Sequence, residues 1–479
     1  MPPLHSALTT SALSLGLDAF LAATALVHAG RGNARATFEC VLTPKAGEGF
    51  FVVAGLEALL DALERFRLKP DELEWLLTVG AIDPTMRDRL LDANFVCDVD
   101  AAPEGTVVFP GEPVITVEGP LWQAQLIESW VTSSIDASTR VATFVARSAI
   151  AGEGAEIIEA ASTRTNRLGG NPLLARAAYV GGAGATTNAL AGKRYGIPVR
   201  ARQPSSFVLS FGSEVAAFES WAKATNEQTL LRVDLRDPFD GVDRAIAAIR
   251  ARATASWSDA PIALEMGTRD LESVARYASE RFAKAGLKPP AIVVSGADLD
   301  AVGIAALRDA SPSIAGFVIA PTAPDGAGAR YELAAIEDDG QWSARIRLGE
   351  GTQSSSVPGR KVLLRYFDAD GAPVGDVAHL ANERHMASRD AKLVDHYTGY
   401  TVRLHDAATS SPVLRNVLRA GKRVSLPEQA SEARERAQRG VEKLARRYKR
   451  LVLPDTYPCG MTTALARLRA ELVGQAHSG

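Results

Sequence analysis

The fold is decided by three short apolar runs, Ile262-Ala-Leu264, Ile292-Val-Val294 and Gly316-Phe-Val-Ile319, which have the length and composition of buried strands. An Ala-rich helix is predicted over 270–285, between the first two runs. Strands that alternate with helices are typical of βα units, in which neighbouring strands run parallel. These residues therefore predict an α/β fold with a parallel sheet or barrel.

The same alternation extends back toward the N-terminus. Two more strand-like runs, Ile197–Val199 and Leu230–Val233, each precede a helical stretch. With at least five strand-and-helix repeats, a barrel is favoured over an open sheet. The helices of this part are predicted over 126–151, 171–179, 213–224 and 240–254.

The chain before residue 126 has a different pattern. Residues 35–42 and Pro113–Val117 are predicted strands, and Pro110-Gly111 indicates a turn before the second of them. The predicted helix Leu56–Arg67 places its leucines on one stripe, as core-facing helices do. This part is therefore expected to be mixed α/β with antiparallel strands. Strand-like segments return after Tyr331, followed by helices predicted around 380–396 and 427–450.

Length and composition narrow the class of protein. A chain of 479 residues is too long for one compact core, so two or more domains are expected. The formal net charge of −3 gives no general electrostatic reason to expect nucleic acid or a membrane as partner. The three scattered cysteines are too few for a disulfide framework or a structural metal site. They suit a reducing cytoplasm, so we expect a cytoplasmic protein.

Two segments resemble targeting or binding sequences, and each has a simpler interpretation. Residues 11–27 are apolar, but no Lys or Arg precedes them and Asp18 interrupts them, so a buried helix is predicted rather than a signal peptide. The basic stripe within 427–450 is interpreted as a solvated helix face rather than an RNA-binding surface. No apolar run approaches the roughly 20 residues that span a bilayer.

One continuous segment, Glu104-Gly-Thr-Val-Val-Phe-Pro-Gly-Glu-Pro-Val-Ile-Thr-Val-Glu-Gly-Pro-Leu121, is similar to the nicotinate phosphoribosyltransferase family. Gln125–Trp130 resembles the family's helix that opens the barrel. Further matches follow in the family's order and spacing along nearly the whole chain. They are Ala177–Gly182, Thr186–Asn188, Tyr195–Val199, Ser206–Phe211, Val294–Leu299, Pro358–Lys361 and Leu453–Pro458.

This resemblance implies an irregular α/β barrel of the type II phosphoribosyltransferase kind beside an α/β sandwich domain. We expect the sandwich domain to comprise residues 1–125, the barrel 126–345, and a C-terminal segment, 346–479, to complete the sandwich and end in helices. The resemblance also implies a homodimer, and a degenerate member could instead pair with an intact homologue. Neither nucleic acid nor a membrane is expected as partner.

In that family nicotinate attacks C1 of phosphoribosyl pyrophosphate, which gives nicotinate mononucleotide and pyrophosphate in NAD salvage. ATP hydrolysis assists by phosphorylating a histidine. Departure of an anionic leaving group calls for cations and backbone amides around two phosphates, usually with Mg²⁺. We therefore expect Mg²⁺ and ATP as cofactors only if this activity is retained.

The catalytic histidine of the family is missing. No histidine lies between His28 and His379, so the predicted barrel contains none. The family motif Gly-Thr-Met-Ala-His-Ser corresponds here to Ala201-Arg-Gln-Pro-Ser-Ser206, which puts Ser205 at the histidine position. A hydroxyl, with a pKa far above neutrality, cannot replace imidazole as the acceptor of a labile phosphoryl group.

Several binding positions of the family are also changed. Asp18 falls near the family's early tyrosine and cannot stack on a pyridine ring. Of two neighbouring arginines, Arg164 is kept, and Arg167 could substitute for the other. Glu265 occupies the position of a family arginine. The acids that remain as catalytic candidates are Asp234, Asp237 and Asp270.

The phosphate loop Gly-Val-Gly-Thr corresponds to Val318-Ile-Ala-Pro321. Pro321 has no amide hydrogen for a phosphate, and Ala320 adds a side chain where the backbone must approach. Thr322 and Arg202 are the further candidates for phosphate contact. Glu332, after Tyr331, replaces a lysine of the family.

Three functions remain open at this point. The first is a family member that has lost the reaction and keeps the scaffold for ligand or subunit binding. The second is a working enzyme with a rearranged site, and the third is an enzyme for another substrate. For the third, Arg200, Arg202, Arg236 and Arg269 would form a new anion site. Alternatively, these arginines pair with Asp234, Asp237, Glu265 and Asp270 and fill the vacated pocket.

Overall fold

The computed structural model divides the chain into two compact units, which we call unit 1 (residues 1–143 and 323–479) and unit 2 (residues 144–322). The predicted limits at 125 and 345 differ from this division. Helix α6 (Glu128–Gly152) begins in unit 1, and strand β12 (Ala329–Asp338) pairs with β1 (Arg35–Leu42) of unit 1. The structure describes residues 11–44, 48–161, 171–225, 229–251, 262–296, 299–311, 313–321, 328–349, 355–383, 391–396 and 398–478.

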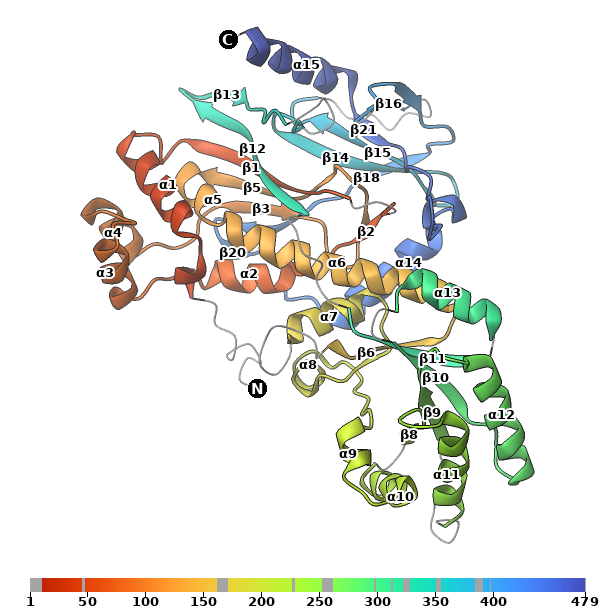
Figure 1. Cartoon of the computed structure of the whole chain (residues 1–479). Coiled ribbons are helices and arrows are strands. Elements are labelled where there is room, and N and C mark those ends of the chain that lie inside the picture. The colour runs from red at the N-terminus through yellow and green to blue at the C-terminus, as the bar shows by residue number, and fades with distance from the viewer. Residues whose placement is uncertain are drawn as a thin grey trace. The chain divides into compact units, whose positions relative to one another are not determined.

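Unit 1 is built around an antiparallel sheet that mixes N- and C-terminal chain (Figure 1). Strand β1 is buried at all but its first position and lies between β12 and β5, so its mostly apolar sequence forms part of the core. The expected antiparallel pairing of the first part is confirmed. The strand order is β13 (Gln341–Ala344), β12, β1, β5 (Pro113–Pro120), β3 (Asp98–Ala101), β19 (Arg415–Arg419) and β20 (Lys422–Arg423).

A second sheet of unit 1 comes almost entirely from the last part of the chain. This sheet corrects the helix predicted around 380–396. Residues 373–380 and 392–395 are strands, and each strand has both buried and more exposed side chains. Residues 384–390 lie outside the described part. The order is β17 (Thr401–Arg403), β16 (Lys392–Asp395), β21 (Cys459–Met461), β15 (Pro373–Leu380), β14 (Lys361–Phe367) and β18 (Thr409–Pro412); β2 (Phe51–Val52) and β4 (Val107–Val108) form a separate pair.

Helices α1 (Leu17–His28) and α2 (Leu56–Glu64) of unit 1 each bury one face. Helix α2 buries its predicted leucine stripe. Helix α1, expected to be buried, is buried on one face only, since Leu17 and Leu21 are exposed. No described helix has both the length and the apolar character needed to cross a membrane. The remaining helices are η1 (Ala12–Ser14), α3 (Pro70–Thr78), α4 (Pro84–Leu91), α5 (Leu121–Leu126), α14 (Ala430–Lys443), η3 (Arg446–Lys449) and α15 (Thr463–Ser478).

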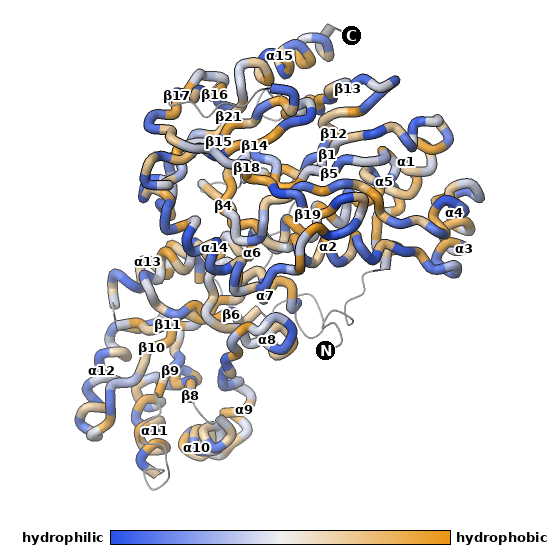
Figure 2. The backbone as a smooth tube through the Cα atoms, turned by 180° about the vertical axis from the view of Figure 1, so that it is seen from behind, coloured by the Kyte–Doolittle hydropathy of each residue, from blue (hydrophilic) through white to orange (hydrophobic). Residues whose placement is uncertain are grey.

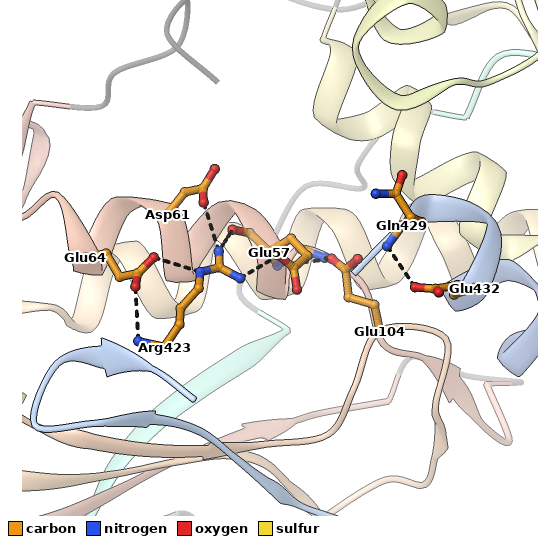
Figure 3. Close-up of polar contacts among 8 residues, drawn as sticks. Glu57, Asp61, Glu64, Glu104, Arg423, Gln429 and Glu432 are labelled. Carbon is orange, nitrogen blue, oxygen red and sulfur yellow. Dashed lines mark hydrogen bonds and ion pairs between the residues drawn. The ribbon is translucent and has the colours of Figure 1, made fainter. Parts of the chain in front are cut away.

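An arginine from the C-terminal chain joins that chain to helix α2. The Arg423 guanidinium donates to the carboxylates of Glu57, Asp61 and Glu64 at 2.7–2.8 Å (Figure 3). The three acids lie on one face of α2 because they are spaced four and three residues apart. Glu104 accepts from the amide of Gly55 at 2.7 Å at the start of the same helix. We call Arg423 and its three acids the Arg423 cluster.

Unit 2 is a six-stranded parallel sheet that curls as half of a barrel and is accompanied by helices (Figure 1). Hydrophobic strands contrast with helices α11 and α12, along which hydrophilic and hydrophobic residues alternate (Figure 2). The strand order is β7 (Ala185–Thr186), β6 (Glu156–Glu159), β11 (Ile314–Ile319), β10 (Ala291–Ser295), β9 (Ile262–Met266) and β8 (Thr229–Arg232).

Most elements predicted for unit 2 are present. The predicted run Ile197–Val199 is reduced to a single bridge between Val199 and Thr186, because the chain continues into an irregular loop. The helices are α7 (Pro172–Gly181), α8 (Ala189–Tyr195), α9 (Ser205–Leu209), α10 (Glu214–Ala224), α11 (Pro238–Arg250), α12 (Leu271–Lys284) and α13 (Ala301–Ala310), with the end of α6.

Candidate functional site

The carboxyl ends of the parallel strands of unit 2 meet at one edge of the sheet, where α/β proteins of this kind place their ligands. Four of the six strands deliver polar groups to this edge, which we call the carboxyl edge. It comprises Glu159 from β6, Thr186 from β7, Asp234 after β8, Glu265 and Gly267 at the end of β9, and Arg202 from the loop after the Val199 bridge.

A two-point ion pair between Arg202 and Glu265 lies at the carboxyl edge. Arg202 Nε donates to Glu265 Oε2 at 3.1 Å, and Arg202 Nη2 donates to Oε1. The Glu265 side chain is fully buried, whereas that of Arg202 is about one quarter exposed. A guanidinium held in this fork geometry has both its charge and its best-placed donors occupied. The prediction that Arg202 pairs with Glu265 is therefore confirmed.

Asp234 is held in place by one donor from the end of the preceding strand, β8, and one donor that follows the neighbouring strand, β9. Its Oδ1 accepts from Arg232 Nε at 2.9 Å, and its Oδ2 accepts from the Gly267 amide at 2.9 Å. The backbone at Gly267 approaches so closely that a Cβ there would lie 3.2 Å from Asp234 Oδ2. Both carboxylate oxygens are therefore engaged by protein donors.

The other two acids predicted as catalytic have local roles. Asp237 is exposed and caps α11, because its Oδ1 accepts from the Asp240 amide at 3.0 Å. Asp270 is also exposed, precedes α12 and has a left-handed φ of 52°. Within the described residues, no hydrogen bond or ion pair joins either of them to Asp234. Among the described residues no group of three or more acids is arranged to hold a metal ion, and a shared catalytic role of the three predicted acids stays a prediction.

The arginines beside these acids differ in their partners. Arg200 lies 3.4 Å from Glu156, which the sequence did not predict as its partner. Arg236 and Arg269 are exposed, and neither forms an ion pair within the described ranges. The predicted pairing of these arginines with the acids is thus correct only for Arg202.

Ser205, which the resemblance places at the family's histidine position, is the first residue of α9 after Pro204 and is half-buried. Arg164, Arg167 and Thr322 lie outside the described residues, so their predicted roles stay predictions. The strand before Thr322 is described: the Ile319 carbonyl accepts from the Ala160 amide at 2.8 Å.

Glu159 is a functional candidate that the sequence reasoning missed. Its carboxylate accepts from the Thr186 hydroxyl and, at 2.6 Å, from the Ala161 amide. Burial raises the pKa of Glu159, against the opposing effect of these two donors. The signal in the sequence was an acid that ends an apolar strand, just before the arginine motif at 160–164.

Gln203 is a second missed residue. It is buried next to Arg202, and its side-chain oxygen accepts from the Arg232 amide at 3.1 Å. In the part of the chain that is described, no group of three or more His, Cys, Asp or Glu side chains is arranged to hold a metal ion. The described carboxyl edge therefore gives Mg²⁺ no such ligand set.

Glu332, which the resemblance places at a lysine position of the family, belongs to unit 1. It lies opposite Glu39 in the β1–β12 ladder. Arg347 donates to Glu332 at 2.6 and 2.8 Å, and Lys361 donates to Glu39 at 2.5 Å. Two like charges directly across a sheet destabilise it, so each acid here has a cation of its own.

Unit 2 has a curled parallel sheet with polar groups at its carboxyl edge, and unit 1 is built around an antiparallel sheet. These features define a protein of the phosphoribosyltransferase fold class. A crystal structure of human nicotinic acid phosphoribosyltransferase has the same fold, with a TM-score of 0.79 at 24% identity over 96% of this chain and all of that chain. The structure of a nicotinate-nucleotide pyrophosphorylase from Pyrococcus furiosus matches 90% of this chain with a TM-score of 0.67 at 18% identity.

Sequence comparison specifies the family. The N-terminal domain of nicotinate phosphoribosyltransferase (NAPRTase) matches residues 18–136, and the C-terminal domain of nicotinate phosphoribosyltransferase matches residues 360–469. The nicotinate phosphoribosyltransferase pncB2 of Mycobacterium tuberculosis is 33% identical over 67% of this chain and 68% of its own length. The human nicotinate phosphoribosyltransferase is 28% identical over 94% of this chain and 95% of its own. The chain belongs to the nicotinate phosphoribosyltransferase family.

Proposed function

We propose that this chain has lost or altered the reaction of its family and keeps the scaffold to bind a ligand or a partner subunit. The family reaction is phosphoribosyl transfer to nicotinate in NAD salvage. The observation that carries the proposal is the Arg202–Glu265 ion pair at the carboxyl edge. By resemblance, an arginine would stand at position 265, so an acid has taken its place and neutralises a neighbouring cation.

The electrostatics of this pair oppose the family chemistry. Departure of pyrophosphate from C1 of the ribose requires cations and amide donors that are aimed at the phosphates before the reaction. At the carboxyl edge, Arg202 is balanced by Glu265, and Arg232 is balanced by Asp234. A pyrophosphate would have to separate one of these pairs, and separating the first would leave the buried Glu265 carboxylate without its partner, which is costly.

The position of Ser205 supports the same proposal. Coupling to ATP requires a side chain that accepts and releases a phosphoryl group at neutral pH, which imidazole does and a hydroxyl does not. The chain has no histidine from residue 29 to residue 378, which includes the whole of unit 2. ATP-driven capture of phosphoribosyl pyrophosphate is therefore not expected.

Calorimetric titration of the purified protein with phosphoribosyl pyrophosphate and Mg²⁺ tests the proposal. We expect no measurable heat of binding under conditions in which a family member that carries the histidine binds. Binding in the micromolar range that is located in unit 2 would contradict the proposal.

A second candidate is a working nicotinate phosphoribosyltransferase with a rearranged site. It is favoured by the buried carboxylate of Glu159 and the fixed carboxylate of Asp234 at the carboxyl edge, and by the names of the relatives at 33% identity. In this case transfer would proceed without ATP coupling. Product formation that does not respond to ATP would distinguish it.

We also propose, from the family resemblance alone, that the protein is a cytoplasmic homodimer or pairs with an intact homologue. Light scattering after size-exclusion chromatography measures the mass of the assembly. Co-purification from the native organism distinguishes a second copy of this chain from a different family member. A monomeric mass together with no co-purified homologue would contradict both arrangements.

A further inference from the structure

Unit 1 contains a pocket whose charged lining residues are all arginines. Its volume is about 190 Å³, and Arg365, Arg415 and Arg436 line it together with Thr106, Phe367 and Ser411. Among the described residues that line it there is no carboxylate. A pocket with this lining favours an anion over a cation or a neutral ligand.

The three arginines come from separate segments that converge through close backbone contacts. Arg365 lies on β14, Arg415 begins β19, and Arg436 lies on α14. Helix α14 packs tightly on the β4 region because Gly440 has no side chain: a Cβ there would lie 2.9 Å from Val107 Cγ2. A Cβ at Gly105, where φ is +80°, would lie only 1.9 Å from the Ala433 carbonyl oxygen. The convergence is therefore part of the packed framework of unit 1.

Two of the arginines are already neutralised. Arg365 donates to Asp376 at 2.5–3.0 Å and to the Val107 carbonyl at 2.8 Å. Arg436 forms a two-point pair with Glu428. Their guanidinium groups still line the pocket, but their charges are balanced by acids that do not line it.

Arg415 supplies the charge that remains. It is exposed, and its side chain makes no ion pair or hydrogen bond with the described residues. Ser411 is the cross-strand partner of Arg365, so the two side chains project from the same face of the sheet. The pocket thus combines one uncompensated guanidinium with two hydroxyls, from Thr106 and Ser411.

We propose that this pocket binds a phosphomonoester. The phosphate lies against Arg415, since a planar guanidinium matches phosphate oxygens at two points, and the hydroxyls of Thr106 and Ser411 contribute further donors. The organic part of the ligand lies along the apolar wall that includes Phe367. This site lies within unit 1 and is independent of the chemistry proposed for unit 2.

Calorimetric titrations with inorganic phosphate and with phenyl phosphate, at matched ionic strength and without Mg²⁺, test the proposal. The test variant is Arg415→Gln. The control is Arg403→Gln, which removes the same charge from an exposed arginine of β17 that does not line the pocket. We expect Arg415→Gln to weaken binding at least tenfold, Arg403→Gln to leave it unchanged, and phenyl phosphate to bind more tightly than inorganic phosphate.

A second variant, Ser411→Glu, places a carboxylate opposite Arg365 on the edge strand β18 and should abolish binding of both probes. Circular dichroism confirms that each variant is folded. The proposal is overturned if neither probe binds at millimolar concentration, or if Arg415→Gln and Arg403→Gln bind alike. Tighter binding of inorganic phosphate than of phenyl phosphate would restrict the site to the free anion and overturn the phosphomonoester.

Phosphoribosyl pyrophosphate also carries phosphates, so it is titrated into the same variants. The comparison shows whether any heat of binding comes from this pocket or from another site. Binding that disappears in Arg415→Gln belongs to this pocket and leaves the proposal for unit 2 standing. Binding that persists in Arg415→Gln lies elsewhere and counts against the proposed loss of function in unit 2. The two proposals can therefore fail separately.

Discussion

Units 1 and 2 use charged side chains in different ways. In unit 1, buried or partly buried ion pairs join segments that are far apart in sequence, as Arg423 does with Glu57 and Lys361 does with Glu39. In unit 2, the pairs Arg202–Glu265 and Arg232–Asp234 lie at the carboxyl edge, whereas Arg244–Glu214 joins two helices. Ion pairs therefore join segments in both units, and in unit 2 they also occupy the edge that we propose as the altered site.

The two regions that match the family's domain sequences can be compared with the two units. Residues 18–136 and 360–469 both lie within unit 1. Most of the changes that the family resemblance implies, such as Ser205, Glu265 and Pro321, lie within unit 2, whereas Asp18 and Glu332 lie within unit 1. A scaffold can therefore keep its family architecture while the groups at its site change, since fold and function depend on different residues.

The largest effect is expected from Arg423→Ala. This change leaves three acids of α2 without their common cation, so the free energy of unfolding of unit 1 should fall by about 3–5 kcal/mol. Urea denaturation measures the loss, and hydrogen exchange should show faster exchange in α2. Arg419→Ala, which removes a half-exposed pair with Asp100, should cost less than about 1 kcal/mol. Equal losses in the two variants would contradict the role of the Arg423 cluster.

A somewhat smaller effect is expected from breaking the pair at the carboxyl edge. Arg202→Met leaves the buried Glu265 carboxylate unpaired and should destabilise unit 2 by about 2–3 kcal/mol. The double variant Arg202→Met/Glu265→Met replaces both charges with apolar groups and should recover most of the loss. Denaturation of the two single variants and the double variant gives the coupling energy. A coupling near zero would show that the pair does not matter in solution.

The last effect, which is the smallest for each pH unit, is a dependence of stability on pH. Burial, and next the nearby Asp376 carboxylate, raise the pKa of Glu112 well above its usual value. The folded state therefore keeps this proton at pH values where the unfolded chain, with a glutamate pKa of about 4.3, has lost it. The stability due to Glu112 is complete below that pH and decreases as the pH rises toward the folded value, by at most about 1.4 kcal/mol per pH unit.

Urea denaturation at several pH values from 5 to 8 measures this dependence. Glu112→Gln mimics the protonated acid, so its stability should fall less steeply with rising pH than that of the unchanged protein. Glu74→Gln, at an exposed position, is the control and should keep the original slope. Identical slopes in all three proteins would show that Glu112 is ionised in the folded state.

Much of the fold could be predicted from the sequence, because apolar periodicity is a local property. The strands at 262–264, 292–294 and 316–319 and the leucine stripe of α2 were predicted from such patterns. The helix predicted near 380–396 was wrong, since pairing with distant strands β14 and β21 decides that segment. The domain limits depend on the same long-range pairing.

The candidate site could be predicted only in part. Pairing of the arginines with nearby acids was expected from alternating charges, and the structure identifies Glu265 as the partner of Arg202. Asp237 and Asp270 were expected to act with Asp234, but each begins a helix and faces its own turn or solvent. Glu159 was missed because one of its partners, Thr186, becomes a neighbour only when β6 pairs with β7.

The most direct test of the central claim is formation of nicotinate mononucleotide. The purified protein is incubated with nicotinate, phosphoribosyl pyrophosphate and Mg²⁺, with and without ATP, and the product is measured by mass spectrometry beside an active family member. We predict no product above the enzyme-free background under either condition. Product that rises in proportion to the concentration of this protein would contradict the proposed loss of the family reaction.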